Sequence, residues 1–140
     1  MGRGDGMKKA KGAVWIDRAI IESPYCIGLC QTEKQFKNEL KRLKVANPEN
    51  HQWVTEGKDA TVTEFEGSKN HDKCFLVGIK QDAKTKPIEI VGLLVHEAVH
   101  IWQMIRQDMN ENEPSIEFEA YSIQKISINL IDAYKLKKCL

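Results

Sequence analysis

Two short segments of the chain have the hydrophobic pattern of paired strands. The stretch TVTEFE at 61–66 alternates apolar and polar residues, which is typical of an edge strand with one exposed face. The stretch CFLVGI at 74–79 is almost continuously apolar, as a buried strand is. Turn-forming residues at 67–70 lie between the two segments. The pattern therefore predicts a hairpin.

Three longer segments are predicted to be helices. In 32–45, apolar residues recur at helical spacing, and Thr32 and Gln35 have the spacing of a capping box. The segment 88–108 has the apolar flanks of a buried helix. The segment 115–137 carries one apolar face, which consists of Ile116, Ala120, Ile123, Ser127, Leu130 and Tyr134.

The N-terminal part of the chain has a different character. Residues 1–12 are rich in glycine and basic residues, which predicts a flexible tail. The run AVWID at 13–17 predicts a first strand, and Ser23-Pro24 breaks the pattern after it. The order strand, helix, hairpin, helix, helix is that of the α+β class. We expect residues 13–140 to form one domain, because 140 residues are enough for one core and few for two.

Charge and hydropathy limit the classes of partner. The net charge of +1 argues against a broad surface for nucleic acid. The apolar run at 88–105 carries two carboxylates and two histidines, and we expect it to be too polar and too short to cross a bilayer. No charged and then apolar leader opens the sequence. We therefore expect a cytoplasmic protein without a membrane or nucleic-acid partner.

The four cysteines are too few for a disulfide scaffold, so reduced thiols are the default expectation. Cys26-x-x-x-Cys30 followed by His71-x-x-Cys74 has half-site spacings that a structural zinc site uses. A long stretch separates the two pairs, and no turn signal frames either of them. This second zinc site is therefore a minor alternative.

The segment 88–108 contains the motif His96-Glu97-x-x-His100. Residues four apart lie on one face of a helix, so both imidazoles can reach one ion. Zinc takes such nitrogens at about 2.0–2.1 Å and keeps a position open for water in catalytic sites. Glu97 lies about 100° round the helix from His96. That position suits a general base, which accepts the proton of a water molecule that attacks a carbonyl.

The motif also has an incidental interpretation, in which two histidines lie by chance on a core helix. Chance placement in a chain of this composition gives such a motif in about one sequence in a hundred. The apolar flanks make chance a poorer explanation, because two buried histidines and a carboxylate without partners are costly. A metal removes that cost.

A third ligand is expected downstream of the motif, where the chain reads Glu117-Phe118-Glu119-Ala120-Tyr121. Here the sequence resembles the gluzincin branch of the zincin metallopeptidases. In that branch a glutamate on a later helix completes the metal site, in a Glu-x-x-x-Asp pattern. Thermolysin-like enzymes and prenyl-protein peptidases show this pattern, the latter often as Glu-Phe-x-Ala-Asp. The resemblance covers residues 91–124 and extends to the rest by architecture, as in small metallopeptidase-like proteins of bacteria and their phages.

The resemblance implies that Glu117 is the third zinc ligand. Tyr121 replaces the aspartate that braces a ligand histidine, and its hydroxyl is a candidate for that role or for polarising the substrate carbonyl. Helix geometry places Glu117 beside the apolar stripe. Glu119 lies about 200° away from Glu117 round the helix and is expected to face solvent. Glu119 and Glu113 are the alternatives, and Glu113 precedes Pro114 in a turn.

The resulting expectation is a minimal zincin-like domain, with a small mixed or antiparallel sheet packed on the motif helix and a C-terminal helix after it. It would bind Zn²⁺ and hydrolyse a peptide or protein substrate, in the host cytoplasm if a phage encodes it. The edge strand at 61–66 would pair with an extended substrate. Tyr121 and Tyr134 are the candidates for stabilising the oxyanion.

Two other functions stay open. A non-catalytic binding or regulatory module on the same scaffold would hold zinc structurally or not at all. A helical interaction protein would carry the histidines by chance. An open coordination position favours the enzyme, and a closed set of ligands favours the module.

Overall fold

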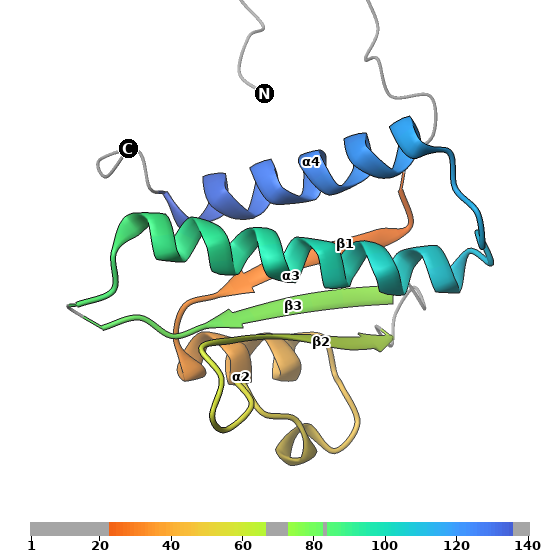
Figure 1. The fold of residues 1–140 in the computed structure, drawn as a ribbon. Helices are drawn as coiled ribbons and strands as arrows, with labels where there is room; N and C mark the ends of the chain where they lie inside the picture. The colour runs from red at the N-terminus through yellow and green to blue at the C-terminus, as the bar shows by residue number, and fades with distance from the viewer. Residues whose placement is uncertain (1–22, 67–72, 83, 136–140) are drawn as a thin grey trace, which may run out of the picture.

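The structure is a computed structural model that describes residues 23–66, 73–82 and 84–135. In this part of the chain a sheet of three strands lies between helices on its two faces (Figure 1). The predicted α+β class is therefore confirmed. The predicted tail at 1–12, strand at 13–17 and turn at 67–70 lie outside the described residues. The elements in order are β1 (Tyr25–Cys30), α2 (Glu33–Arg42), a 3₁₀ turn (Pro48–Asn50), β2 (Ala60–Glu66), β3 (Lys73–Ile79), α3 (Pro87–Asp108) and α4 (Ile116–Tyr134).

β3 is the central strand of the sheet, in the order β1-β3-β2. It pairs with β2 in antiparallel fashion, from Ala60 opposite Ile79 to Glu66 opposite Lys73. The predicted hairpin strands and the edge position of β2 are therefore confirmed. β3 is buried between helices on both faces, which explains why its sequence is continuously apolar.

The strand β1 was missed by the sequence analysis. It begins directly after the Ser23-Pro24 break and runs parallel to β3. Its sequence YCIGLC has a central glycine and no regular alternation of burial. A Cβ atom at Gly28 would lie 2.8 Å from Leu76 Cδ2, so a larger residue there would require the Leu76 side chain to move. Tertiary packing, and not local propensity, makes this segment a strand.

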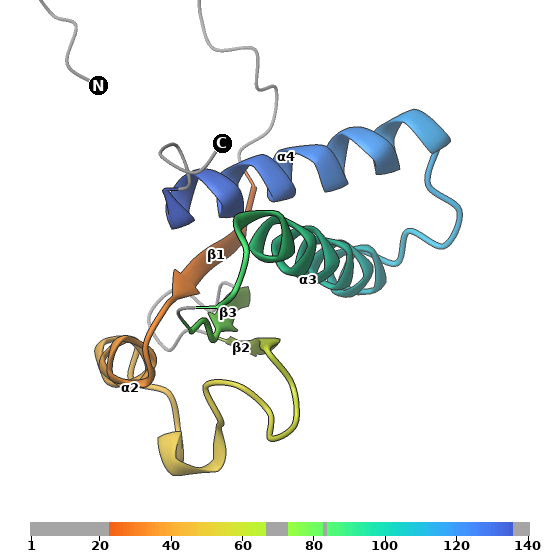
Figure 2. The same cartoon turned by 60° about the vertical axis from the view of Figure 1, so that its left-hand side comes forward.

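The helices form two layers, with α3 and α4 on one face of the sheet and α2 on the other (Figure 2). α3 lies over β2 and β3, and α4 lies over β1. The side chains of Phe36 and Leu40 fill the α2 layer. Thr32 caps α2 as predicted by accepting from the backbone N–H of Gln35 at 3.1 Å. The Gln35 side chain accepts from the N–H of Gln31 instead of completing a capping box.

The predicted apolar face of α4 is confirmed from Ile123 to Tyr134, where these residues and Leu130 are buried or pack against the core, but it is wrong at the start of the helix. Ile116 and Ala120, the first two members of the predicted apolar face, are exposed. The buried residues of α4 are Ile126, Ser127 and Leu130. The C-terminal half of α4 therefore packs into the core through its apolar face. At its start, α4 contacts α3 through Glu119 and Trp102.

By length and composition alone α3 could cross a membrane, although we expected the run at 88–105 to be too polar and too short. Core helices of soluble proteins pass the same test. In this fold α3 buries Ile90, Leu94, Ala98 and Ile101 against the sheet and α4. These contacts account for its apolar sequence without a bilayer.

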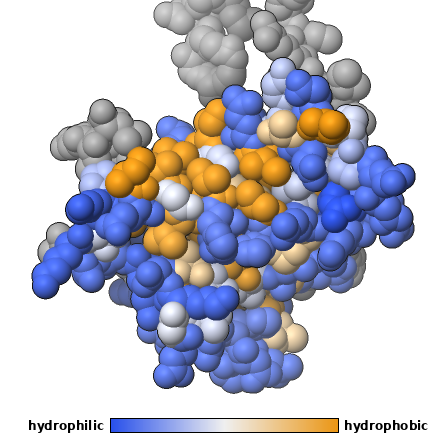
Figure 3. All heavy atoms as spheres, in the orientation of Figure 1, coloured by the Kyte–Doolittle hydropathy of each residue, from blue (hydrophilic) through white to orange (hydrophobic). Residues whose placement is uncertain are grey.

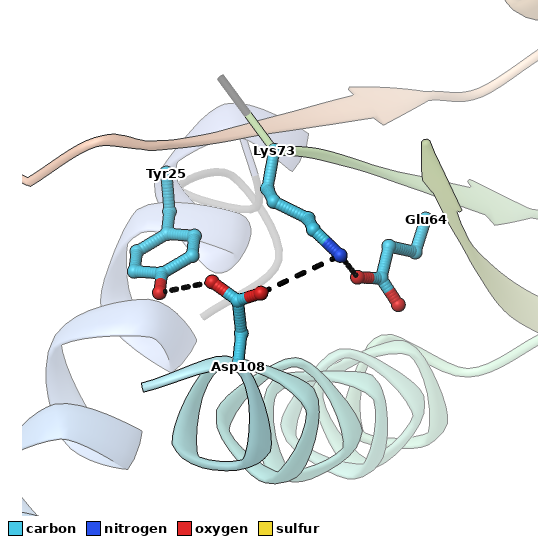
Figure 4. A network of polar contacts seen from close by, with 4 residues as sticks. All are labelled: Tyr25, Glu64, Lys73 and Asp108. Carbon is cyan, nitrogen blue, oxygen red and sulfur yellow. Dashed lines mark hydrogen bonds and ion pairs between the residues drawn. The ribbon is translucent and has the colours of Figure 1, made fainter. Parts of the chain in front are cut away.

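Four polar side chains join all three strands to the C-terminal end of α3 (Figure 4). The Tyr25 hydroxyl donates to Asp108 Oδ2 at 2.6 Å. Lys73 Nζ lies 2.9 Å from Glu64 Oε2 and 3.5 Å from Asp108 Oδ1. Burial and the bond to Asp108 raise the pKa of Tyr25 to about 12. The same bond, together with Lys73, lowers the pKa of Asp108.

We predict that this network makes the stability of the protein sensitive to alkali. An unfolded tyrosine titrates near about 10, so the contribution of Tyr25 is complete below that pH. It is lost as the pH rises through about 12, the pKa of Tyr25 in the folded protein. Tyr25→Phe should lower the melting temperature at pH 8. It should also flatten the decline of the melting temperature between pH values of about 10 and about 12.

The control for this prediction is Tyr121→Phe, since Tyr121 is 65% exposed. It should leave the wild-type decline in place when melting is followed by circular dichroism. An equally steep alkaline decline in wild type and Tyr25→Phe would show that the Tyr25–Asp108 bond does not carry the effect.

Candidate metal centre

The two histidines of the motif point their Nε2 atoms at one another from the exposed side of α3. The Nε2 atoms of His96 and His100 are 3.1 Å apart, and the rings are nearly perpendicular. Two zinc–nitrogen bonds of about 2.0–2.1 Å at a tetrahedral angle place the nitrogens roughly 3.3–3.4 Å apart. The pair therefore already has close to the separation that one zinc ion requires.

Gln103 is a further residue of this centre that the sequence analysis missed. Its Oε1 lies 3.0 Å from Nδ1 of His100. If Nδ1 carries the proton and donates to this amide oxygen, Nε2 keeps its lone pair for a metal. The signal in the sequence is the spacing of three from His100 to Gln103, which places both on one face of the helix.

Glu97 is the buried member of the motif, with 5% of its surface exposed. Burial raises the pKa of its carboxyl group, and the nearby charges of His96, His100 and Lys58 oppose that shift. A carboxylate with a raised pKa holds a proton more readily, which is the property of a general base. The structure therefore places a basic carboxylate directly beside the histidine pair.

Two open hollows meet at the motif, along the edge strand β2. The first, of about 830 Å³, extends toward Lys80, Asp82 and Glu89. The second, of about 400 Å³, extends along β2 and toward Gln103 and Gln107. Four residues line both hollows: Lys58, Ala60, His96 and Glu97. The motif thus faces solvent beside the edge of β2 that pairs with no other described strand.

α4 lies on the opposite side of α3 and does not bring Glu117 to the histidines. The contact between the two helices runs through Trp102, which is about 200° round α3 from His100. Trp102 Nε1 donates to Glu119 Oε2 at 2.9 Å, and its ring meets Phe118 edge to face. Glu119 therefore faces α3 and Glu117 is exposed, which is the reverse of the prediction for these two residues.

No third ligand joins the pair within the part of the chain that the structure describes. There, no group of three histidine, cysteine or acidic residues has metal-binding geometry. This holds for Glu117 and for both alternatives, Glu119 and Glu113. Tyr121 is exposed on α4 and Tyr134 packs at the edge of the core, and neither lines the two hollows. The predicted oxyanion role has no geometric support for either tyrosine.

The cysteine alternative is also excluded by the strand geometry. Cys26 and Cys74 are neighbours in register on β1 and β3. Cys30 lies at the other end of β1, four residues along, which is roughly 13 Å in a strand. Cys26 and Cys30 are therefore too far apart to bind one ion. His71, the fourth member of that proposed set, lies outside the described residues.

Comparison with known proteins adds no family to this description. A scan of protein-family models, a search of curated proteins and a search of solved structures each found no match.

We predict that Glu119, and not Glu117, contributes to stability. Glu119→Ala removes a hydrogen bond to the Trp102 indole, which is 3% exposed. The expected loss is about 1–2 kcal/mol in the free energy of unfolding, measured by urea titration. Glu117→Ala, two residues away on the exposed side, should change it by less than about 0.5 kcal/mol. Equal losses in both variants would contradict the observed rotation of α4.

Proposed function

We propose that the protein is a zinc-dependent hydrolase of peptide bonds. In this proposal His96 and His100 bind the ion, and Glu97 is the general base. The observation that supports it is the convergence of the two Nε2 atoms to 3.1 Å beside a buried carboxylate. Neutral imidazoles at this distance share one hydrogen bond, and loss of the shared proton would leave both Nε2 atoms free to bind one ion.

The residues present fit two of the ligands of a zinc ion. The nitrogens have the right separation, and Gln103 holds His100 in the orientation that presents Nε2. The carboxylate ligand that the resemblance implied is not supplied by Glu117 in this arrangement. When bound, zinc would polarise the substrate carbonyl and lower the pKa of water. The proton transfer and the binding of the substrate are assigned to Glu97 and to the edge strand β2.

Glu97 would remove the proton from the attacking water. Its side chain lines both hollows, so it reaches the same space as the histidines. Burial favours the protonated form that follows proton transfer, and the positive charge of Lys58 keeps the carboxylate available before it. The carboxyl group then has a proton to give to the leaving amine.

The edge strand β2 supports a peptide as the class of substrate. One side of β2 pairs with β3, and the other borders the hollow that contains His100. An extended peptide can add to such an edge through main-chain hydrogen bonds. That position would bring its carbonyl groups past the histidine pair, as expected from the alternating sequence of 61–66.

A binding module is the second candidate, and exposed apolar side chains favour it. Apolar residues gather over the α3 and α4 layer in Figure 3. Ile88, Ile128 and Tyr121 are 69%, 52% and 65% exposed. Such surfaces often contact partners. The two candidates differ in one measurable property, because only the hydrolase cleaves a bound peptide.

We predict that the chain binds about one zinc ion, with ligands from the histidine pair. His96→Ala or His100→Ala should weaken zinc binding by at least about 100-fold, measured by competition with a chromophoric chelator. Glu117→Ala should bind zinc as the wild type does, because the structure places Glu117 away from the pair. The proposal fails if wild-type protein binds no zinc and added zinc does not raise its melting temperature.

Glu97→Gln separates binding from hydrolysis. The amide has nearly the same shape but cannot take a proton from water. We expect zinc affinity within a few-fold of wild type and at least about a 100-fold loss of casein cleavage, followed by mass spectrometry of new peptide ends. A loss of zinc as complete as that in His96→Ala would make Glu97 a ligand and refute its role as base.

A further inference from the structure

Lys58 is held at the junction of the two hollows by the turn that precedes β2. Its backbone N–H donates to the carbonyl of Thr55 at 3.0 Å, and Gly57 between them has a φ of 85°. The N–H of Thr55 in turn donates to Thr61 Oγ1 on β2 at 2.9 Å. A residue other than glycine would be strained at position 57. The turn therefore fixes the base of Lys58 relative to the edge strand.

In the part of the chain that the structure describes, no partner neutralises the charge of Lys58. Among the described residues its ammonium group forms no hydrogen bond or ion pair, whereas Lys73 is bound to Glu64 and Asp108. The field of Lys58 instead acts on Glu97, together with the fields of the two histidines. A free cation thus faces the same space as the motif.

No other charged donor within residues 23–66, 73–82 and 84–135 has this position. Of the four residues that line both hollows, Lys58 is the only one outside the motif with a polar side chain. Lys80 and Lys84 line only the first hollow, and the second has Thr55, Thr61, Gln103 and Gln107 as its neutral polar residues. Tyr121 and Tyr134 line neither.

We propose that Lys58 is a catalytic residue that stabilises the oxyanion formed from the substrate carbonyl, an inference that rests on the proposed peptidase function. As the water oxygen bonds to the carbonyl carbon, the carbonyl electron pair moves onto its oxygen and the water proton goes to Glu97. The Lys58 ammonium donates to that oxygen. When the carbon–nitrogen bond breaks, the electron pair returns to the carbonyl and Glu97 gives its proton to the amine.

A charge placed before the reaction where the negative charge will develop stabilises the transition state more than the ground state. The peptide carbonyl is neutral, so the pairing with Lys58 strengthens only as the oxygen becomes an anion. The binding of a ligand that already carries a tetrahedral anion should therefore depend on Lys58. The binding of zinc alone should not.

The test uses zinc-loaded full-length protein and a dipeptide phosphonate, whose tetrahedral anion resembles the reacting carbon. Lys58→Met should weaken phosphonate binding by about 100-fold or more in calorimetry, in the range of a lost oxyanion donor. Lys58→Arg should recover most of it. Lys80→Met is the matched control, since Lys80 lines one hollow only. It should bind as the wild type does, and all variants should keep wild-type zinc affinity and melting temperature.

The outcomes separate the two proposals. Zinc-dependent phosphonate binding that is equal in wild type and Lys58→Met would overturn the role of Lys58 and leave the peptidase proposal in place. Equal weakening by Lys58→Met and Lys80→Met would show general attraction of an anion and would also overturn it. A wild type that binds no zinc would refute the peptidase proposal, and the role of Lys58 with it.

Discussion

The rotation of α3 about its own axis is the constraint on which the rest of the structure depends. Leu94, Ala98 and Ile101 have no exposed surface, and burying each contributes about 1–3 kcal/mol relative to solvent. With these residues turned to the core, a period of 3.6 sends His96 and His100 to the side of the edge strand. The same period sends Trp102 to the other side, where α4 packs. The burial of one face of α3 therefore places the histidine pair on one side of the helix and the contact with α4 on the other.

Glu97 lies at the border between these two requirements. Its position turns it inward, and a buried carboxylate without partners is costly. The field of two histidines and Lys58 reduces that cost without a direct ion pair. A carboxylate that is retained against this cost, beside two exposed imidazoles, is typical of a functional site.

The elements set by local pattern could be predicted from the sequence. The cap at Thr32, the alternation in 61–66 and the apolar flanks of the motif each require only neighbouring residues, and the structure has a helix, an edge strand and a core helix there. β1 could not be predicted in this way, because the segment is short, Gly28 interrupts it and its polar and apolar residues do not alternate. Its partner β3 supplies the hydrogen bonds, and Leu76 occupies the space that a side chain at Gly28 would need. β3 and Leu76 lie far from β1 along the sequence, so a pattern of neighbouring residues does not reveal the pairing.

The orientation of α4 shows the same limit at the site itself. Glu117 and Glu119 are two positions apart, so only the rotation of the helix decides which one faces α3. The sequence of α4 favours Ile116 and Ala120 as contacts by periodicity. At the start of α4, Trp102 of α3 makes the contact instead, because its indole N–H finds an acceptor there and its ring packs on Phe118. The acceptor is the carboxylate of Glu119, so this side chain joins α4 to α3 by a hydrogen bond. The histidine side of α3 is left open to solvent along β2, so the hollow beside the histidine pair borders β2 and not α4.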